Sequence, residues 1–403
     1  MKYVVILGDG MADYPQKSLN GKTPLELAKK PNIDALAKNG IVGLCKTVPD
    51  GMKPGSDVAN LSVMGYDVKA CYTGRSPLEA ESIGVKLKDT DVTARTNLVT
   101  LSDEENYQDK TMIDYSAGEI STSEAKELIE YIAKNLNSEE YKFYAGISYR
   151  HCLVIDNGKL AGDLTPPHDI TGKPIKDYLP KSEQGKKLLA LMEKSALLLK
   201  DHPVNLARIK AGKRPANSIW FWGEGTKPSL QNFAKRYGVK GGVISAVDLL
   251  KGIGKLTGLK VIEVEGATGN YDTNFTGKAN ACIDQLKNDV DYMYLHMEAP
   301  DECGHHGDAE HKIWSIEQID KLVVAPIKQA LDQMGENYKI LVCPDHPTPL
   351  CLMTHVSDPV PFIIYDSSNK RESVVDSYTE KQASKTGLFV KSGIELAQLF
   401  FKG

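Results

Sequence analysis

Carboxylate and imidazole side chains gather at four places in the sequence, mostly directly after apolar runs that are typical of buried strands. They are Asp9, the pair Asp301 and His305, the pair Asp345 and His346, and His355. Six of the nine histidines, residues 296, 305, 306, 311, 346 and 355, fall within one 60-residue stretch. Because the carboxyl ends of parallel strands meet at one edge of a sheet, we expect the side chains at the four places to converge.

Oxygen and nitrogen ligands without thiolate suit Mn²⁺, Zn²⁺ or Fe better than a structural cysteine–zinc site. Six such side chains exceed the ligand count of one tetrahedral ion, so two ions that share a phosphoryl oxygen are predicted. Taken singly, an Asp after a strand is more often a helix cap or a turn, and a lone His is more often structural. The joint pattern favours the metal site.

Ser56 follows Gly55 and opens a predicted helix over residues 56–64. A phosphate on this serine would lie against free backbone amides and the positive end of the helix dipole. The alternative is that Ser56 only caps the helix. A serine oxygen activated by a bound metal ion is an effective nucleophile, so the sequence predicts phosphoryl transfer.

Five motifs together resemble the cofactor-independent phosphoglycerate mutases, in the short archaeal-type branch of the alkaline phosphatase superfamily. The motifs are D-G-M-A-D from residue 9, P-G-S-D-V-A-N-L-S from 54, D-x-x-G-H-x-G-D from 301, P-D-H-P-T-P from 344 and T-H-x-x-D-P-V-P from 354. The resemblance covers essentially the whole chain. The sequence places a further histidine at His306, which need not be a ligand.

The resemblance implies how the ligands divide between two ions. Asp301, His305 and His355 would hold one, and Asp9, Asp345, His346 and the Ser56 oxygen the other. Mn²⁺ is the expected metal, with Zn²⁺ and Mg²⁺ as alternatives. Ser56 would take phosphate from 3-phosphoglycerate, the glycerate would reorient without leaving, and phosphate would return to the 2-hydroxyl. No 2,3-bisphosphoglycerate would be needed.

A mutase must retain glycerate and exclude water while the serine is phosphorylated, which requires a lid with cationic side chains. The candidates are Arg75, Arg95, Arg150, Arg214 and Lys278, with His151 as a candidate proton shuttle. A solvated surface charge is the alternative for each Arg or Lys, and His151 could be only a strand residue. The expected partner is a small anionic phosphorylated metabolite.

Other functions remain open at this stage. A homoserine kinase or another phosphoryl transferase could use the same residues, as could a phosphomonoesterase or a phosphopentomutase-like enzyme. A metal-stabilised binding protein is the non-catalytic alternative. The sequence contains no G-x-x-x-x-G-K-[ST] motif, and Gly252-Ile-Gly254 lacks the dinucleotide-binding spacing.

The composition of the chain limits which partners and which cellular compartment we expect. The net charge of −4 provides no global basic field for nucleic acid or an anionic membrane. Seven scattered cysteines without a C-x-x-C pair argue against a disulfide framework and for a reducing compartment. The apolar run at residues 3–7 is too short for a signal peptide, and no stretch approaches the roughly 20 residues of a membrane span. We therefore expect a cytoplasmic protein, and its oligomeric state cannot be predicted.

The predicted fold is α/β, an alkaline-phosphatase-like, doubly wound, mainly parallel sheet with an inserted α+β cap. Short apolar strands alternate with helices, which favours a parallel sheet covered by helices. The strands predicted for this core are residues 3–7, 218–222, 243–245, 260–264, 292–297, 338–342 and 362–365. Predicted helices include residues 23–39 and a long one over 309–334, bent at Pro326.

The middle of the chain has a different pattern. Residues 95–101, 142–147 and 151–155 are predicted strands, and residues 121–136 form a helix whose start has capping-box spacing. We place the core domain at residues 1–82 and 216–403, and the substrate-binding cap at residues 83–215.

Overall fold

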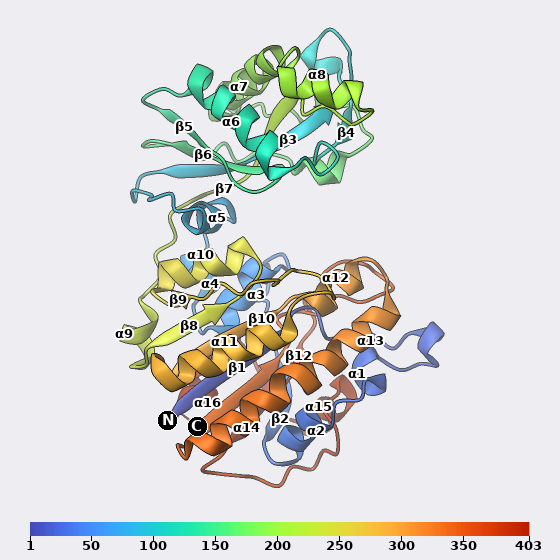
Figure 1. The fold of residues 1–403 in the computed structure, drawn as a ribbon, viewed down its shortest axis with the longest axis vertical. Helices are drawn as coiled ribbons and strands as arrows, with labels where there is room; N and C mark the ends of the chain where they lie inside the picture. Colours follow the sequence, from blue (N-terminus) through green and yellow to red (C-terminus); the bar gives the residue numbers. More distant parts are fainter. Residues whose placement is uncertain (403) are drawn as a thin grey trace. The chain divides into compact units, whose positions relative to one another are not determined.

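A computed structural model describes residues 1–402 of the chain. The chain folds into two compact units, coloured along the sequence in Figure 1. The core unit comprises Met1–Tyr72 and the chain from Leu230 onward, and the inserted unit is Thr73–Ser229.

The inserted unit begins earlier and ends later than the predicted cap over residues 83–215. It includes helix α5 (Ser76–Ser82) and strand β7 (Ser218–Thr226). Strand β7 pairs antiparallel with β3 (Val92–Leu101), so the assignment of residues 218–222 to the core sheet is wrong. An apolar run indicates a buried strand but does not identify the sheet that it joins.

The core unit is built on an eight-stranded sheet in the order β13-β2-β12-β11-β1-β10-β8-β9. Strand β12 alone runs antiparallel to its neighbours, which confirms the prediction of a mainly parallel sheet. The strands are β1 (Lys2–Gly8), β2 (Ile41–Cys45), β8 (Gly241–Ile244), β9 (Lys260–Val261), β10 (Tyr292–Met297), β11 (Tyr338–Cys343), β12 (Val360–Asp366) and β13 (Phe389–Val390).

Helices cover both faces of this sheet, as the doubly wound fold requires. Alternate residues of β10 point to opposite faces. Met293 and Leu295 join a core with α2 (Pro31–Lys38), α11 (Phe275–Asn288) and α14 (Ala325–Met334), the last two lying side by side in Figure 1. Tyr292 and Tyr294 instead contact α9 (Phe233–Tyr237) and α3 (Ser56–Val63).

The remaining helices of the core unit complete these layers. They are α1 (Pro24–Leu27), α4 (Val68–Cys71), α10 (Asp248–Thr257), α12 (Ala299–His305), α13 (Ala309–Gln318), α15 (Glu380–Lys385) and α16 (Gly393–Lys402), with the 3₁₀ turn η1 (Lys17–Leu19).

Two predicted helices are interrupted at or near proline. The helix predicted over residues 23–39 is divided into α1 and α2, because Pro31 begins a new helix. The helix predicted over residues 309–334 contains a wide π-type segment, η5 (Ile319–Val324), between α13 and α14. Pro326 lacks an amide hydrogen and its ring crowds the preceding turn, which accounts for an irregularity at this point.

The inserted unit has a five-stranded antiparallel sheet, in which β3 pairs with β4, β6 and β7, and β5 pairs with β6. Its other elements are β4 (Met112–Asp114), β5 (Tyr141–Tyr144), β6 (Arg150–Ile155), α6 (Thr122–Leu136), α7 (Glu183–Leu199), α8 (Pro203–Lys210), η2 (Tyr107–Asp109), η3 (Pro167–Ile170) and η4 (Lys176–Tyr178). In Figure 1, α6, α7 and α8 lie on one side of the sheet and α5 on the other.

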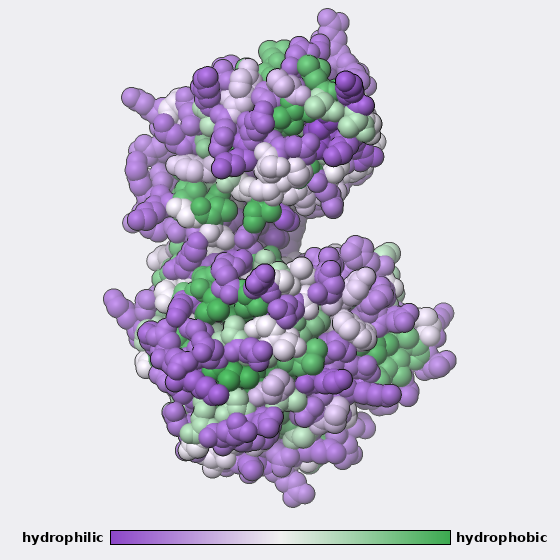
Figure 2. Space-filling model, in the orientation of Figure 1, coloured by the Kyte–Doolittle hydropathy of each residue, from purple (hydrophilic) through white to green (hydrophobic). Residues whose placement is uncertain are grey.

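The visible surface of each unit is mostly hydrophilic (Figure 2). Among the described residues, no helix combines the length and apolar character needed to cross a membrane. All seven cysteines are free, and six of them are buried while Cys351 is exposed.

Candidate metal centre

Three neighbouring strands of the core sheet bring the predicted ligands to one edge. Asp9 follows β1, Asp345 and His346 follow β11, and α12 starts just after β10. Strands β10 and β11 both pair in parallel with β1, so their carboxyl ends lie together. Helix α12 places Asp301 and His305 on one face, because residues four apart are neighbours on a helix.

The first group of candidate ligands is Asp9, Asp345 and His346. One ligand atom from each lies within 4.8 Å of the others. His346 Nε2 is 3.3 Å from Asp345 Oδ2 and 3.6 Å from Asp9 Oδ1. All three side chains are buried.

The second group is Asp301, His346 and His355, whose ligand atoms also lie within 4.8 Å of one another. His305 joins it, since His305 Nε2 is 3.3 Å from Asp301 Oδ2 and 2.8 Å from His355 Nε2. His346 therefore lies within reach of both groups. The structure brings all six predicted Asp and His side chains together.

The electrostatics of this cluster favour a bound cation. Burial raises the pKa of Asp9, and the nearby charges of Asp345 and Asp301 raise it further. Among the described residues, no hydrogen-bond donor serves the buried Oδ1 atom of Asp9. Burial lowers the pKa of His346, which keeps its imidazole in the neutral form that binds metals. The donor set and the surplus of buried negative charge both fit divalent metal ions.

Ser56 lies beside the first group. Its Oγ atom is 3.3 Å from His346 Nε2 and 3.5 Å from Asp9 Oδ2. Gly55 occupies the N-cap position of α3, so Ser56 is the first helical residue and its side chain does not cap the helix. The hydroxyl is directed instead to the Asp and His cluster.

Several supporting residues were not predicted. The buried Asn60 donates to the Ser56 carbonyl at 2.8 Å and to Asp345 Oδ2 at 2.9 Å, which ties the serine helix to a candidate ligand. The Thr348 hydroxyl donates to Asp301 Oδ1. The motifs that carry the ligands contain both residues, and this proximity in sequence was the available signal.

Gly10 is a further unpredicted requirement of the site. Its φ of +60° is a left-handed conformation that L side chains rarely adopt. A Cβ atom here would lie 2.6 Å from Asp301 Oδ1 and 2.6 Å from Thr348 Oγ1. The glycine after Asp9 thus lets the loop approach α12 closely.

Lys278, predicted to bind substrate, lies inside the core unit. Its side chain is fully buried and forms an ion pair with Glu298, and its Nζ donates to the His296 carbonyl at 3.0 Å. The prediction that Lys278 contacts substrate is not supported by this placement. Helix α11 begins at Phe275, so Lys278 is in its first turn, but the side chain points into the protein.

Three of the predicted arginines collect on the α5 face of the inserted sheet. Arg75 Nε donates to Glu79 Oε1 at 2.9 Å, and Arg95 Nε lies 2.8 Å from Glu79 Oε2. Arg95 also lies over the Trp222 ring at 4.0 Å. Arg150 is opposite Asn97, two residues along β3 from Arg95, so both arginines share this face.

The charges of these arginines act on one carboxylate. Burial alone would raise the pKa of Glu79, but Arg95, Arg75 and Arg150 lower it overall. Glu79 is therefore ionised between guanidinium groups that outnumber it. The net positive charge suits an anionic ligand.

His151 points to the opposite face of the same sheet. It pairs in register with Thr96, one residue out of phase with Arg95 and Asn97. Burial, and to a smaller extent the charge of Arg150, lowers the pKa of His151 to about 3. Its Nδ1 accepts the Gly146 amide at 3.0 Å. A neutral imidazole on the helix-covered face does not support the predicted proton shuttle.

Arg214, the last of the predicted substrate residues, pairs with Asp114 at the end of β4. Its side chain is half exposed. The structure does not join it to the arginines around Glu79.

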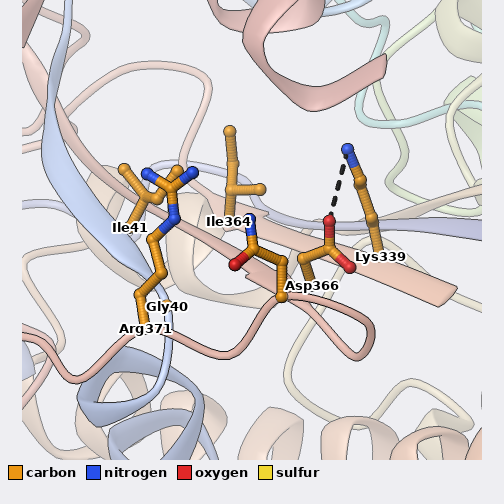
Figure 3. Close-up of a pocket in the computed structure, with 7 residues that line it drawn as sticks. Gly40, Ile41, Lys339, Ile364, Asp366 and Arg371 are labelled. Atoms are coloured by element: carbon orange, nitrogen blue, oxygen red, sulfur yellow. Dashed lines mark ion pairs between the residues drawn. The ribbon is translucent and has the colours of Figure 1, made fainter. Parts of the chain in front are cut away.

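A crevice at the other end of the core strands does not compete as an active site. Figure 3 shows it beside the Lys339–Asp366 ion pair, whose charged atoms are 3.5 Å apart. Lys339 is at the start of β11, whereas the candidate ligands follow its end. The cavity of about 10 Å³ has room for no more than a water molecule.

Comparison with known proteins identifies the family to which this chain belongs. A family model described as 2,3-bisphosphoglycerate-independent phosphoglycerate mutase matches residues 37–205. A Geobacter sulfurreducens protein named as a probable enzyme of this kind is 51% identical over 99% of both chains. The chain belongs to the 2,3-bisphosphoglycerate-independent phosphoglycerate mutase family. A Methanothrix thermoacetophila protein named as such a mutase is 48% identical over 100% of both chains.

Solved structures extend this family relationship to the fold. A Pyrococcus horikoshii protein superposes with a TM-score of 0.82 at 30% identity, covering 99% of this chain and 96% of that one. A cofactor-independent phosphoglycerate mutase from Thermoplasma acidophilum has a TM-score of 0.65 at 26% identity, covering 99% and 100%. The family resemblance inferred from the motifs is confirmed. The family model spans Ser56 and the arginines around Glu79, so its match includes parts of both units.

Proposed function

We propose that this protein interconverts 3-phosphoglycerate and 2-phosphoglycerate without 2,3-bisphosphoglycerate, through a phosphoserine at Ser56. The observation that carries this proposal is the contact of Ser56 Oγ with Asp9 and His346 at the start of α3. The names of relatives that match over the full chain support the same reaction.

Two divalent metal ions would be held by the Asp and His cluster. Asp9, Asp345 and His346 would hold one together with the Ser56 oxygen, and Asp301, His305 and His355 would hold the other. Mn²⁺ is the proposed ion, and Zn²⁺ and Mg²⁺ are alternatives because they accept the same kinds of oxygen and nitrogen donors. When bound, such ions lower the pKa of a hydroxyl and neutralise charge on a phosphoryl group.

Residues around Ser56 would accept and position the phosphoryl group. Ser56 Oγ would accept the phosphoryl group, and the first turn of α3 would direct backbone N–H groups toward the added phosphate. Asn60 would hold the serine and Asp345 in one arrangement through its two hydrogen bonds. A fixed arrangement favours the reaction because the reacting atoms start near their final positions.

The glycerate would be retained by Arg75, Arg95 and Arg150. Guanidinium groups bind carboxylate and phosphate in a planar, two-pronged geometry. Glu79 would hold Arg75 and Arg95 in place through their Nε atoms. The excess of positive charge would hold glycerate while the phosphate is on the serine, which separates a mutase from a phosphatase.

The test is an enolase-coupled assay with 3-phosphoglycerate, on metal-stripped protein resupplied with Mn²⁺ and without bisphosphoglycerate. We expect turnover in the wild type and a loss of roughly 10³-fold or more in Ser56→Ala, as when other nucleophiles are removed. Ser123→Ala, at an exposed position of α6, serves as the matched control with unchanged turnover. Unchanged turnover in Ser56→Ala, or none in wild-type protein that binds Mn²⁺, would overturn the proposal.

A further inference from the structure

Four ionisable side chains form a line through the interior of the core unit. They are Asp9 after β1, His296 at the end of β10, Glu298 just beyond it, and Lys278 on α11. Their exposed fractions are 3%, 1%, 2% and 0%. The predicted ligand Asp9 stands at one end of the line, and the other three residues are neither predicted ligands nor accessible to substrate.

Each member of the line contacts the next. His296 Nε2 is 2.9 Å from Asp9 Oδ2, and His296 Nδ1 is 3.2 Å from Glu298 Oε1. Glu298 in turn pairs with Lys278, which also donates to the His296 carbonyl. Two further donors hold Glu298 Oε1, the Ser245 hydroxyl at 3.0 Å and the Ala246 amide at 2.6 Å.

The hydrogen bonds fix the position of the imidazole. The Ser245 hydroxyl has a single proton, which it donates to Glu298, so its oxygen accepts from His296 Nδ1 at 3.1 Å. The same oxygen accepts the Val247 amide at 3.0 Å, which anchors Ser245 to the backbone. His296 is therefore held on one side and presents Nε2 to Asp9.

Such a buried line of charges is not explained by stability alone. Replacing buried ion pairs with apolar residues of similar volume is often neutral or stabilising. The line ends at a carboxylate that lies next to two others, Asp345 and Asp301, whose charges repel it. Asp9 has one oxygen, Oδ2, against His296, while no donor among the described residues reaches Oδ1.

We propose that Lys278, Glu298 and His296 are positioning residues that hold Asp9 Oδ2 so that Oδ1 is presented to a divalent cation. The inference rests on the metal site of the proposed function. Residues behind a metal ligand orient it and tune its affinity, and changing them typically weakens metal binding by about 10- to 100-fold.

The test measures Mn²⁺ binding to the metal-stripped full chain by titration calorimetry, with electron paramagnetic resonance to count bound ions. The wild type should bind two ions. Glu298→Gln keeps the size of the side chain but removes the charge between His296 and Lys278. We expect this variant to weaken the binding of one of the two ions by roughly 10-fold or more and to leave the affinity for the other ion unchanged.

Two further variants separate positioning from stability. Asp320→Asn changes an equally buried carboxylate that accepts the Ile33 amide at 2.7 Å, and should lower the melting temperature without altering Mn²⁺ affinity. Adding Lys278→Met to Glu298→Gln removes the unpaired lysine charge, and should restore stability but not affinity. If Glu298→Gln does not fold, Ser245→Ala gives a milder disturbance of the same line.

The outcomes are distinct. Two ions bound with wild-type affinity in folded Glu298→Gln or Ser245→Ala would overturn the inference and leave the proposed function standing. Affinity that recovers together with stability in the double variant would also overturn it, because the line would then be only structural. A wild type that binds no Mn²⁺ would overturn the metal site itself, and the inference with it.

Discussion

At the scale of single residues, Gly10 allows the loop after β1 to approach Asp301 closely. Gly10→Ala adds a Cβ atom 2.6 Å from Asp301 Oδ1 at a φ of +60°. We expect a loss of about 2 to 5 kcal/mol in the free energy of unfolding, from backbone strain and overpacking together, and weaker Mn²⁺ binding. Chemical denaturation and calorimetry would measure the two effects.

Gly21→Ala is the matched control for this prediction. Gly21 also has a positive φ, of +74°, but no atom lies within 4 Å of its added Cβ. The variant should lose only ~1 kcal/mol, from the backbone alone, and bind Mn²⁺ normally. Equal effects in the two variants would contradict the role of close approach at Gly10.

Glu380 predicts a pH dependence of stability. Burial raises the pKa of this carboxyl to about 7, against a smaller opposing effect of its hydrogen bonds from Thr23 and Asp13. Between about pH 4.5 and about pH 7, the folded state holds a proton that the unfolded state has released. The free energy of unfolding therefore falls as pH rises through this range.

Glu380→Gln should remove this part of the pH dependence. As pH rises through this window, the wild type should lose stability that the variant keeps. The free energy of unfolding of the variant should therefore rise relative to that of the wild type. Denaturation at several pH values would measure it, with Glu372→Gln at an exposed position as the control. A difference that does not change with pH would count against the raised pKa.

The convergence of the six Asp and His side chains could be predicted because each lies beside a strand end or inside a short motif. The placements of Lys278 and His151 do not support their predicted roles, for a common reason. The sequence shows a charge near a strand end, but not whether the side chain points outward or meets a buried partner such as Glu298. His151 and Arg150 are adjacent in β6, so their side chains point to opposite faces of the sheet. The pairing register sets which face each side chain takes.

At the scale of elements, α5 carries the carboxylate that organises two arginines of the inserted sheet. Glu79→Gln removes the charge that holds Arg75 and Arg95 through their Nε atoms. We expect KM for 3-phosphoglycerate to rise by roughly 10-fold, equivalent to about 1.4 kcal/mol of binding free energy, with a smaller change in kcat. Steady-state kinetics would separate the two constants.

Glu81→Gln, two residues along the same helix, is the control for α5. It should leave both constants near their wild-type values, since Glu79 is the carboxylate that contacts the Nε atoms of Arg75 and Arg95. A kcat that falls alone in Glu79→Gln, with KM unchanged, would argue that Glu79 does not act through substrate binding.

The hydrophobic patterns of the sequence predicted the strands of the core sheet better than the breaks within the helices. Strand β10 was predicted with its observed bounds, because a run of six mostly apolar residues is typical of a strand buried on both faces. The break at Pro31 was not predicted, although proline favours the first turn of a new helix. A bend was predicted at Pro326, and the structure has the widened segment η5 just before this residue. Strand β7 was assigned to the wrong sheet because its partner β3 is more than 100 residues away.

At the scale of the whole molecule, the inserted unit has its own sheet and hydrophobic core. Its two ends lie together, since the Thr73 hydroxyl donates to the Thr226 carbonyl. We expect residues 73–229 expressed alone to fold, because the segment contains all partners of its strands. Circular dichroism should show one cooperative thermal transition, and the absence of a transition would contradict this.

The cysteines give the molecule a practical property. Cys351 is exposed and the other six are buried, with the pKa of Cys45, Cys282 and Cys343 raised by burial. A thiol-reactive fluorophore would therefore attach to the native chain at one place, without engineering. That place is four residues before His355, one of the residues proposed to hold a metal ion, so we expect the emission of the dye to change when Mn²⁺ is added.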